Sequence, residues 1–226
     1  MKEFLEKLDE WKVNLTKERL TVLECFARAV IEKNQKLNLI SRKDIGNIWS
    51  RHILDSLAFA PATAGVLADL KDRLIIDAGS GGGFPGIPNG IFVNEAEFEL
   101  WEASRKKHSF LTWITSSLKL KNIRAVCRRI EECRNAGDII LERAAGKLEN
   151  ILPQCLNILR EDGFLFAWQS DVRIIRQESF KEILLKHKAE IKEIYNYTLP
   201  AETRERFIII FKKNTKQIHG GAQQRR

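Results

Sequence analysis

The N-terminal part of the chain carries apolar residues at the spacing of amphipathic helices. They are Phe4, Leu5, Leu8 and Trp11, followed by Leu20, Leu23, Phe26, Ala27, Val30 and Ile31. A polar stretch at 38–44 interrupts this pattern. A further helix is expected over about 45–59, ending before Pro61 because proline disfavours helical backbone at the residue before it. A second short helix is expected after Gly65.

From Arg73 onward, short apolar runs alternate with helical patterns, which is typical of βαβ crossovers and a parallel sheet. Strands are predicted at about 74–77, 97–101, 123–127, 138–142, 163–168, 191–197 and 206–212. Helices are predicted near 86–92, 105–119, 146–160 and 174–188, between the first six strands. No helix separates the last two strands, so the last strand can return as an antiparallel neighbour. The pattern predicts an α/β fold with a doubly wound sheet of seven strands.

The pattern divides the chain into three parts. Residues 1–70 form a helical extension, 71–213 form a Rossmann-like domain, and 214–226 form a basic tail that is expected to be disordered.

A glycine-rich turn follows the first predicted strand and leads into a helix. Residues 79–83 contain four glycines, which let the backbone turn sharply and lie against a ligand. Gly81, Gly83 and Gly86 match the spacing of a dinucleotide fingerprint, but this spacing begins too late after the strand. Pro85 also lacks the N–H that a diphosphate needs at a helix start. A nucleoside with an amino-acid tail, as in S-adenosylmethionine, therefore fits better, and the sheet is that of class I methyltransferases.

Acidic residues lie at or shortly after the ends of the first three predicted strands. Glu102 closes the second strand, where a carboxylate accepts hydrogen bonds from ribose hydroxyls; the alternative is a solvent-facing loop residue. Asp77 either receives the ligand's ammonium through a water molecule or a backbone amide, or caps the glycine turn. Ile130 and Glu131 follow the third strand, where an adenine would lie, although Glu131 and Glu132 can also start a helical turn.

The charge of the chain indicates a polyanionic partner. The sequence holds 38 Lys and Arg against 30 Asp and Glu, a net charge of +8, which favours nucleic acid. Candidate RNA-binding residues are Arg105, Lys106, Lys107, Arg128 and Arg129. Such clusters are also common as solvated helix faces.

Composition limits the other classes of function. Apolar residues make up 44% of the chain, enough for a sizeable core. No apolar run approaches the roughly 18 residues of a membrane span, and the start of the chain does not resemble a secretory signal, so a cytoplasmic location without membrane contact is expected. The cysteines and histidines have no metal-ligand spacing, and no metal is expected.

Charged residues also end the fourth predicted strand. Arg143 is expected at the edge of the sheet where donor and acceptor meet, and Glu142 is either a salt-bridge partner or a contact for an incoming base. His52 and Asp55, one helical turn apart, either line the RNA side or attach the helical extension to the sheet.

Several motifs together resemble a known family. They are the segments 34–41, 51–57, 77–88, 129–132 and 142–144, spread along most of the chain. In this combination the sequence resembles ribosomal RNA small-subunit methyltransferase G, also called glucose-inhibited division protein B. The chain departs from the family pattern at Glu142, where a small hydroxylated residue is usual, and at Trp168-Gln169-Ser170, where a lysine-glycine pair is usual.

The resemblance implies S-adenosylmethionine as methyl donor and N7 of a guanine in 16S ribosomal RNA, in a loop near the decoding site, as acceptor. The substrate would be naked RNA, an assembly intermediate or the small subunit, and a monomeric enzyme is expected. Together with Gly81 of the turn, the donor contacts would be Gly79, Phe84, Glu102, Ala103, Ser104, Ile130, Glu131 and Arg143. Arg143 would contribute to catalysis by positioning, because attack by N7 needs no general base.

Two other readings remain open. One is methylation of another RNA or of a protein, because the donor half is shared among many acceptors. The other is an RNA-binding or ribosome-assembly factor that keeps the same fold.

Overall fold

The computed structural model describes residues 1–215. Its N-terminal part is helical, with bounds α1 Lys2–Glu10, α2 Lys17–Leu37, the 3-10 helix η1 Arg42–Asn47, the π-helical turn η2 Trp49–Leu54, α3 Asp55–Leu57 and α4 Phe59–Ala64. The predicted helix end before Pro61 is wrong, because Pro61 is the third residue of α4. The first N–H groups of a helix have no partner within the helix, so proline is tolerated there. The helix expected after Gly65 is also absent, since residues 65–73 are turns, bends and irregular chain.

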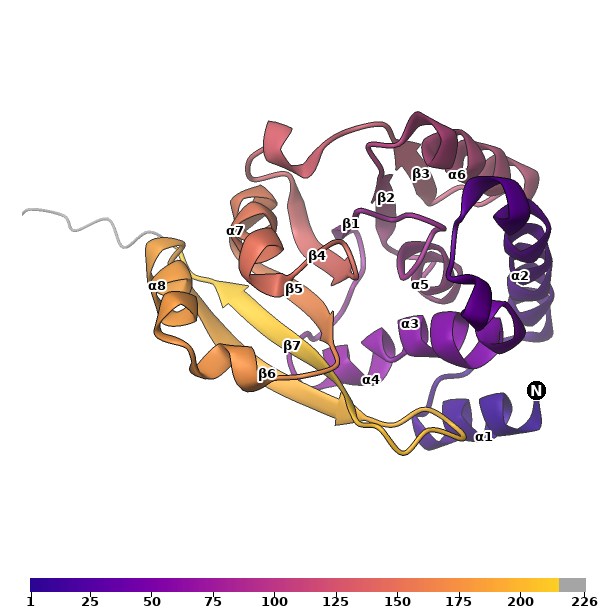
Figure 1. The fold of residues 1–226 in the computed structure, drawn as a ribbon, viewed down its shortest axis with the longest axis horizontal. Helices are drawn as coiled ribbons and strands as arrows, with labels where there is room; N and C mark the ends of the chain where they lie inside the picture. Colours follow the sequence, from indigo (N-terminus) through magenta and orange to yellow (C-terminus); the bar gives the residue numbers. More distant parts are fainter. Residues whose placement is uncertain (216–226) are drawn as a thin grey trace, which may run out of the picture.

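The seven predicted strands form one sheet in the order β3-β2-β1-β4-β5-β7-β6. Their bounds are β1 Leu74–Ala78, β2 Glu97–Trp101, β3 Ile123–Val126, β4 Gly137–Arg143, β5 Leu159–Gln169, β6 Ala189–Tyr197 and β7 Arg206–Lys213. Neighbouring strands from β3 through β5 are parallel, whereas β7 is antiparallel to both β5 and β6 (Figure 1). The predicted fold class is therefore confirmed, including the antiparallel last strand.

The helices between the strands lie close to their predicted positions. They are α5 Gly86–Phe92, α6 Arg105–Ser117, the 3-10 helix η3 Ile130–Glu132, α7 Leu148–Ile158, the 3-10 helix η4 Arg173–Arg176 and α8 Glu178–Lys186. The helix predicted near 174–188 is divided between η4 and α8.

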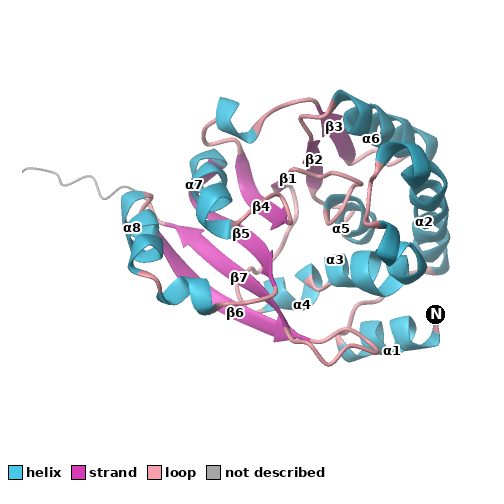
Figure 2. Ribbon diagram, viewed as in Figure 1, coloured by secondary structure: helices cyan, strands magenta, loops and turns pink. Residues whose placement is uncertain are grey.

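Helices cover both faces of the sheet (Figure 2). Ile75 and Leu141 pack in a core that includes Phe26 of α2 and Leu111 of α6, whereas residues such as Ile140 face a second core built on α7 and α8. The central strands β1 and β4 are buried on both faces and read as apolar runs, whereas the edge strand β6 alternates half-buried and exposed residues.

The N-terminal helices share the first of these cores with the sheet. Phe4 of α1 and Phe59 of α4 belong to the same cluster as Phe166 of β5. The division into an extension at 1–70 and a domain at 71–213 therefore stays a prediction. Of the tail at 214–226, residues 216–226 lie outside the described part.

The chain order creates a switch point between β1 and β4. From β1 the sheet extends through β2 and β3 on one side and through β4 and β5 on the other, so loops leaving the two strands diverge. Ligands of doubly wound sheets bind at this point, outside the carboxyl ends of the strands. Within residues 1–215, no helix is long and apolar enough to cross a membrane.

The first residue of α5 provides a test of packing at this point. A Cβ at Gly86 would clash with Leu100 Cδ2 and would lie 2.6 Å from Asp77 Oδ2. We expect Gly86→Ala to lower the free energy of unfolding by about 1–3 kcal/mol, the usual cost of overpacking a core. Urea denaturation followed by circular dichroism measures the change. Gly46→Ala is the matched control, because a Cβ there meets no atom within 4 Å; equal stability of the two variants would contradict the expectation.

Candidate functional site

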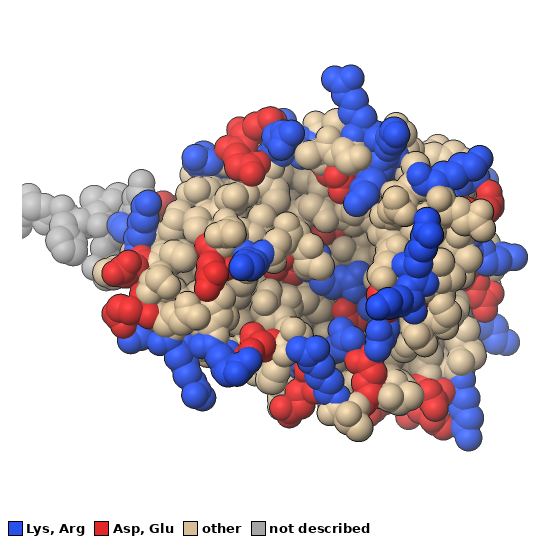
Figure 3. Space-filling view, viewed as in Figure 1, with Lys and Arg blue, Asp and Glu red and all other residues tan. Residues whose placement is uncertain are grey.

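A cavity of about 610 Å³ opens at the carboxyl ends of β1, β2 and β4. The view in Figure 3 shows this face of the molecule hollowed at its centre, with Lys and Arg side chains around the hollow. Predicted site residues that line the cavity are Gly79, Gly81, Phe84, Glu102, Ala103, Lys107, Arg128, Arg129, Ile130, Glu131 and Arg143. We call it the first cavity. Ser104, Arg105 and Lys106 follow Ala103 in the chain without lining it.

The glycine turn forms the floor of the first cavity. Gly79 and Ser80 donate their backbone N–H groups to the carbonyl oxygen of Trp101, both at 3.0 Å, which ties the turn to the end of β2. Gly81 has φ +55°, a left-handed conformation that favours glycine, and a Cβ there would touch only the carbonyl oxygen of Gly79, at 3.9 Å. The turn therefore presents backbone rather than side chains to the cavity.

Glu102 is held by the backbone around it. One carboxylate oxygen accepts the N–H of Gly81 at 2.9 Å, and the other accepts the N–H of Ser104 at 2.7 Å. These bonds direct the carboxylate across the end of β2, along the wall of the cavity. A carboxylate has about four lone-pair positions, so two acceptor positions remain for a ligand.

Asp77 lies fully buried below the turn. Its Oδ2 accepts the hydroxyl of Ser80 at 2.5 Å and the N–H of Gly86 at 2.8 Å, so it caps the turn. Its Oδ1 is buried without a hydrogen-bond partner among the described residues. Burial raises the pKa of Asp77 to about 6, although both hydrogen bonds act in the opposite direction. The contacts of Asp77 therefore match the capping reading, and its other oxygen is unpaired and does not line the first cavity.

The segment after β3 closes the other side of the first cavity. Ile130 and Glu131 form the 3-10 turn η3, as the second reading of these residues expected. The guanidinium of Arg128 lies 5.3 Å from the ring centre of Trp101, a cation–π arrangement. Arg128, Arg129 and Lys107 thus bring positive charge to the cavity wall.

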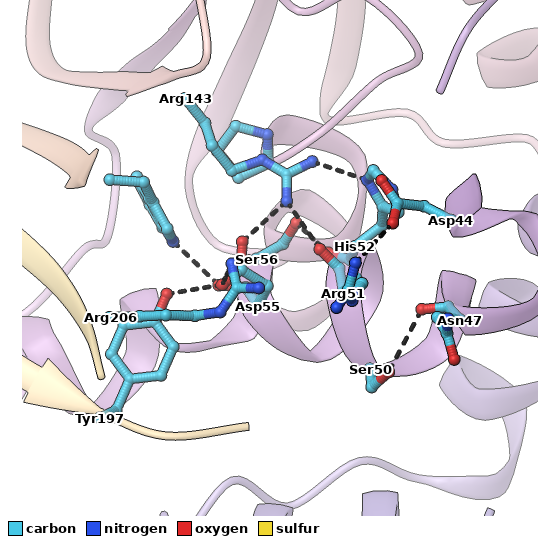
Figure 4. A network of polar contacts seen from close by, with 12 residues as sticks. Asp44, Asn47, Ser50, Arg51, His52, Asp55, Ser56, Arg143, Tyr197 and Arg206 are labelled. Carbon is cyan, nitrogen blue, oxygen red and sulfur yellow. Dashed lines mark hydrogen bonds and ion pairs between the residues drawn. The ribbon is translucent and has the colours of Figure 1, made fainter. Parts of the chain in front are cut away.

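Arg143 is fixed at the end of β4 by contacts with the N-terminal helices (Figure 4). Its Nη1 donates to Asp55 Oδ2 at 2.9 Å and to the carbonyl oxygen of Arg51 at 3.3 Å. Its Nη2 lies 3.2 Å from His52 Nδ1, and its guanidinium lies 5.4 Å from the ring centre of Phe84. The side chain therefore has one orientation before any ligand arrives.

His52 is neutral in this arrangement. Burial, and then the nearby guanidinium of Arg143, lower the pKa of His52 to about 3. Because a guanidinium only donates, His52 Nδ1 is the acceptor and Nε2 carries the proton. Nε2 lies 3.7 Å from Asp44 Oδ2 and has no hydrogen-bond partner among the described residues.

Asp55 attaches the N-terminal helices to the sheet. Its Oδ1 accepts from the hydroxyl of Tyr197 at 2.7 Å and from Arg206 Nη1 at 3.3 Å, while its Oδ2 accepts from Arg143 (Figure 4). Its backbone oxygen accepts the indole N–H of Trp168 at 2.9 Å. Of the two readings of Asp55, attachment of the extension to the sheet is the one that its contacts match.

Glu142 does not reach the first cavity. Its side chain is fully buried; Oε1 accepts the N–H of Ala145 at 3.0 Å, and Oε2 has no partner among the described residues. Neither expected role fits, because Glu142 has no ion pair in residues 1–215 and is shielded from an incoming base. Burial raises the pKa of Glu142 to about 7, and the charge of Asp77 acts in the same direction.

Sequence reasoning missed the part of the wall that comes from the N-terminal segment. Leu39, Ile40, Ser41 and Asp44 line the first cavity. In the sequence, the polar stretch at 38–44 shows only as an interruption of the helical pattern. Asn34 Oδ1, which accepts the N–H of Ile40 at 2.9 Å, holds this segment in place. Within residues 1–215, no cluster of His, Cys, Asp and Glu could hold a metal ion.

Comparisons with known proteins agree on one family. A family model described as rRNA small subunit methyltransferase G matches residues 19–206. The Ribosomal RNA small subunit methyltransferase G of Syntrophus aciditrophicus is 32% identical over 93% of this chain and 88% of its own length. The protein of the same name from Syntrophomonas wolfei is 33% identical over 84% of this chain and 89% of its own length.

Solved structures share the fold at low sequence identity. A methyltransferase from Pyrococcus furiosus has a TM-score of 0.53 and 14% identity, over 71% of this chain and 83% of that one. P. horikoshii TYW2 in complex with MeSAdo has a TM-score of 0.52 and 17% identity, over 64% of this chain and 58% of that one.

The buried Glu142 makes stability depend on pH. Because its pKa rises from 4.5 to about 7 on folding, the folded chain holds the proton more tightly than the unfolded chain. Its contribution to stability is therefore full below about pH 4.5, is lost as the pH rises from there to about 7, and stays lost above. We expect Glu142→Gln, which keeps an acceptor for Ala145, to be more stable than the wild type at pH 8 by on the order of 1–2 kcal/mol, and nearly equal to it at pH 4.

Urea denaturation at the two pH values measures this difference. Glu132→Gln, at an exposed glutamate after β3, is the control and should change little at either pH. Asp77 titrates in wild type and variants alike, and because its charge raises the pKa of Glu142, the measured difference includes this coupling. A Glu142→Gln protein less stable than the wild type at pH 8 would contradict the expectation.

Proposed function

Because the chain belongs to the rRNA small subunit methyltransferase G family, we propose that it transfers a methyl group from S-adenosylmethionine to N7 of a guanine in 16S ribosomal RNA. The observation that carries the donor half is the first cavity, where bare glycine backbone and the Glu102 carboxylate meet at the switch point of the sheet. Family membership carries the acceptor half.

The residues around the first cavity match the chemistry of the donor. Glu102 has acceptor positions left for the two ribose hydroxyls. Ile130 supplies apolar surface for the adenine. Arg143 lines the cavity, so its cation fits the carboxylate of the amino-acid tail. The buried, unpaired Oδ1 of Asp77 does not line the cavity, so it would act on the ammonium through a water molecule or a backbone amide.

The reaction requires alignment of N7, the methyl carbon and sulfur, and it requires no proton transfer. The N7 lone pair attacks the methyl carbon, the carbon–sulfur bond breaks, and its electron pair stays on sulfur. The guanine gains the positive charge that the sulfonium loses, and no proton moves. Arg143 holds its orientation through Asp55 and His52, so it can fix a donor or acceptor group near the line of attack.

The basic rim supports an RNA acceptor. Lys107, Arg128 and Arg129 line the mouth of the first cavity, and Arg105 and Lys106 are exposed on the adjoining first turn of α6. Figure 3 shows Lys and Arg side chains around the central hollow. Phosphates of a bound RNA would neutralise these cations and release counterions. Transfer of label from tritiated donor to small-subunit RNA tests the activity; an RNA-binding factor of the same fold would transfer none.

Glu102 should decide donor affinity. We expect Glu102→Ala to weaken binding of S-adenosylmethionine by about 1–3 kcal/mol, the range for losing hydrogen bonds to a charged group. Isothermal titration calorimetry measures the dissociation constant. Glu97→Ala is the matched control, because Glu97 is exposed at the opposite end of the same strand. An affinity unchanged in Glu102→Ala would mean that the ribose partner lies elsewhere.

The rim should decide the salt dependence of RNA binding. We expect the double variant Arg105→Ala, Lys106→Ala to reduce the slope of log affinity against log salt by about 1–2, because each phosphate that is no longer neutralised lowers the slope by roughly one unit. Fluorescence anisotropy with a labelled RNA fragment measures the slope, and donor affinity should stay the same. Lys181→Ala, Lys186→Ala, on α8, is the control of equal charge. Equal slopes in the two double variants would exclude this part of α6 from the RNA surface.

A further inference from the structure

A second cavity, of about 390 Å³, adjoins the first one. The two cavities share Asp44, His52, Arg143 and Ala144 as lining residues. Residues beyond this common wall come from β5, β6, β7 and the N-terminal helices. The two cavities therefore adjoin along these residues, which line both of them.

Two residues of the common wall are fixed by their surroundings. Arg143 is held by Asp55 and His52, as described above. Ala144 has φ +60°, in the left-handed region that a residue with a Cβ rarely adopts, and its side chain is a single methyl group. Such strained backbone persists where the surroundings impose it, often at functional sites. At Ala144, both cavities are therefore lined by backbone and a single methyl group.

Some of the polar groups that line the second cavity already have hydrogen-bond partners, and others do not. Both oxygens of Asp55 are bonded to side chains of the sheet. Arg51 donates through Nε to Glu202 at 2.8 Å and through Nη1 to Asp44 at 2.9 Å. These bonds leave Arg51 Nη2 without a hydrogen bond to any residue in 1–215. The amide of Gln169, which also lines the cavity, has no side-chain hydrogen bond within that part of the chain either.

We propose that the second cavity receives the acceptor base, extruded from the RNA, with N7 at the border where the second cavity meets the first and with Arg51 and Gln169 reading guanine. This proposal rests on the proposed function for the identity of the base. The Nη2 group of Arg51 donates to O6, which lies beside N7 on the same edge of the base. The amide oxygen of Gln169 accepts from N1–H and the exocyclic amine further around the ring.

This arrangement discriminates against adenine. Adenine has an amine where guanine has O6, so it would place a donor against the Arg51 donor. Its N1 is an acceptor without a hydrogen, so it offers nothing to the Gln169 oxygen at that position. Extrusion also explains how an atom at the edge of a stacked base could reach the wall, because enzymes that modify bases take them out of the stack. Arg51 and Gln169 are thus specificity residues of the reaction, whereas Arg143 is a positioning residue.

Gly146 offers a way to fill the second cavity alone. It lines the second cavity but not the first. A Cβ at Gly146 meets no atom within 4 Å, and its backbone is not left-handed, so a large side chain there is free of local strain. Gly46 has the same open surroundings, is exposed, and lines neither cavity. Gly146→Trp and Gly46→Trp are therefore matched test and control variants.

The experiment uses the full chain and three readouts. Calorimetry with S-adenosylhomocysteine reports on the first cavity, and single-turnover methyl transfer to small-subunit RNA reports on the reaction. Saturation-transfer NMR with free guanosine, recorded with S-adenosylhomocysteine in excess, reports on the second cavity without any turnover. We expect Gly146→Trp to keep its affinity for S-adenosylhomocysteine within about twofold, to lose the guanosine signal, and to slow transfer about tenfold or more. Gly46→Trp should match the wild type in all three.

A second variant keeps the test independent of how Gly146→Trp folds. Gln169→Leu removes the amide at nearly constant size, and we expect about tenfold slower transfer and a guanosine signal reduced to that of adenosine. Wild-type transfer and guanosine signal in both variants would overturn the base pocket while leaving the proposed function intact. Loss of the guanosine signal in the variants, with no transfer by the wild type, would instead overturn the proposed function and support the pocket.

Discussion

The buried carboxylate of Asp55 is the interaction on which the site depends. It binds Arg143 of β4, Tyr197 of β6 and Arg206 of β7, and the backbone oxygen of the same residue binds Trp168 of β5. One residue thus connects the N-terminal helices to four strands. A buried charge persists only where partners replace its water, and removal of one partner from such a pair commonly costs about 3–5 kcal/mol. The position of the N-terminal helices and the orientation of Arg143 are therefore a single arrangement.

Two buried carboxylates lie near the glycine turn and Arg143, and their burial is electrostatically unfavourable. Asp77 and Glu142 are both buried, each has one carboxylate oxygen without a partner in residues 1–215, and burial raises the pKa of both. A chain selected for stability alone would place apolar residues there. For Asp77 the cost has a counterpart, because its capped oxygen orders the turn that lines the first cavity. For Glu142, the N–H of Ala145 and the nearby charge of Arg143 offset part of the cost, and the bond to Ala145 orders the loop of the common wall.

The strands and the glycine turn were predictable because their causes are local. A buried strand shows as an apolar run, and a left-handed turn shows as glycine; the predicted strand positions match the structure to within a few residues. The Asp55 cluster was not predictable, because its partners Tyr197 and Arg206 lie 142 and 151 residues away. Arg143 was placed correctly at the strand end, but its partners come from helices that the pattern could not orient. Leu39 and Asp44, which line the first cavity, were not predictable either. A polar interruption of a helical pattern does not indicate where the chain runs next.

The protonation states around Arg143 fit a reaction that moves no proton. His52 would be the obvious base of such a site, but burial and the neighbouring cation lower its pKa to about 3, and its Nδ1 is occupied by Arg143. It therefore stays neutral at physiological pH and acts as a hydrogen-bond acceptor that steers the guanidinium. The groups with pKa values raised toward neutrality, Asp77 and Glu142, lie behind the turn and the wall loop rather than in the second cavity. The acceptor side is thus electrostatically constant across neutral pH, as attack by a base nitrogen with a free lone pair requires, whereas any pH response of the site arises from the buried carboxylates on the donor side.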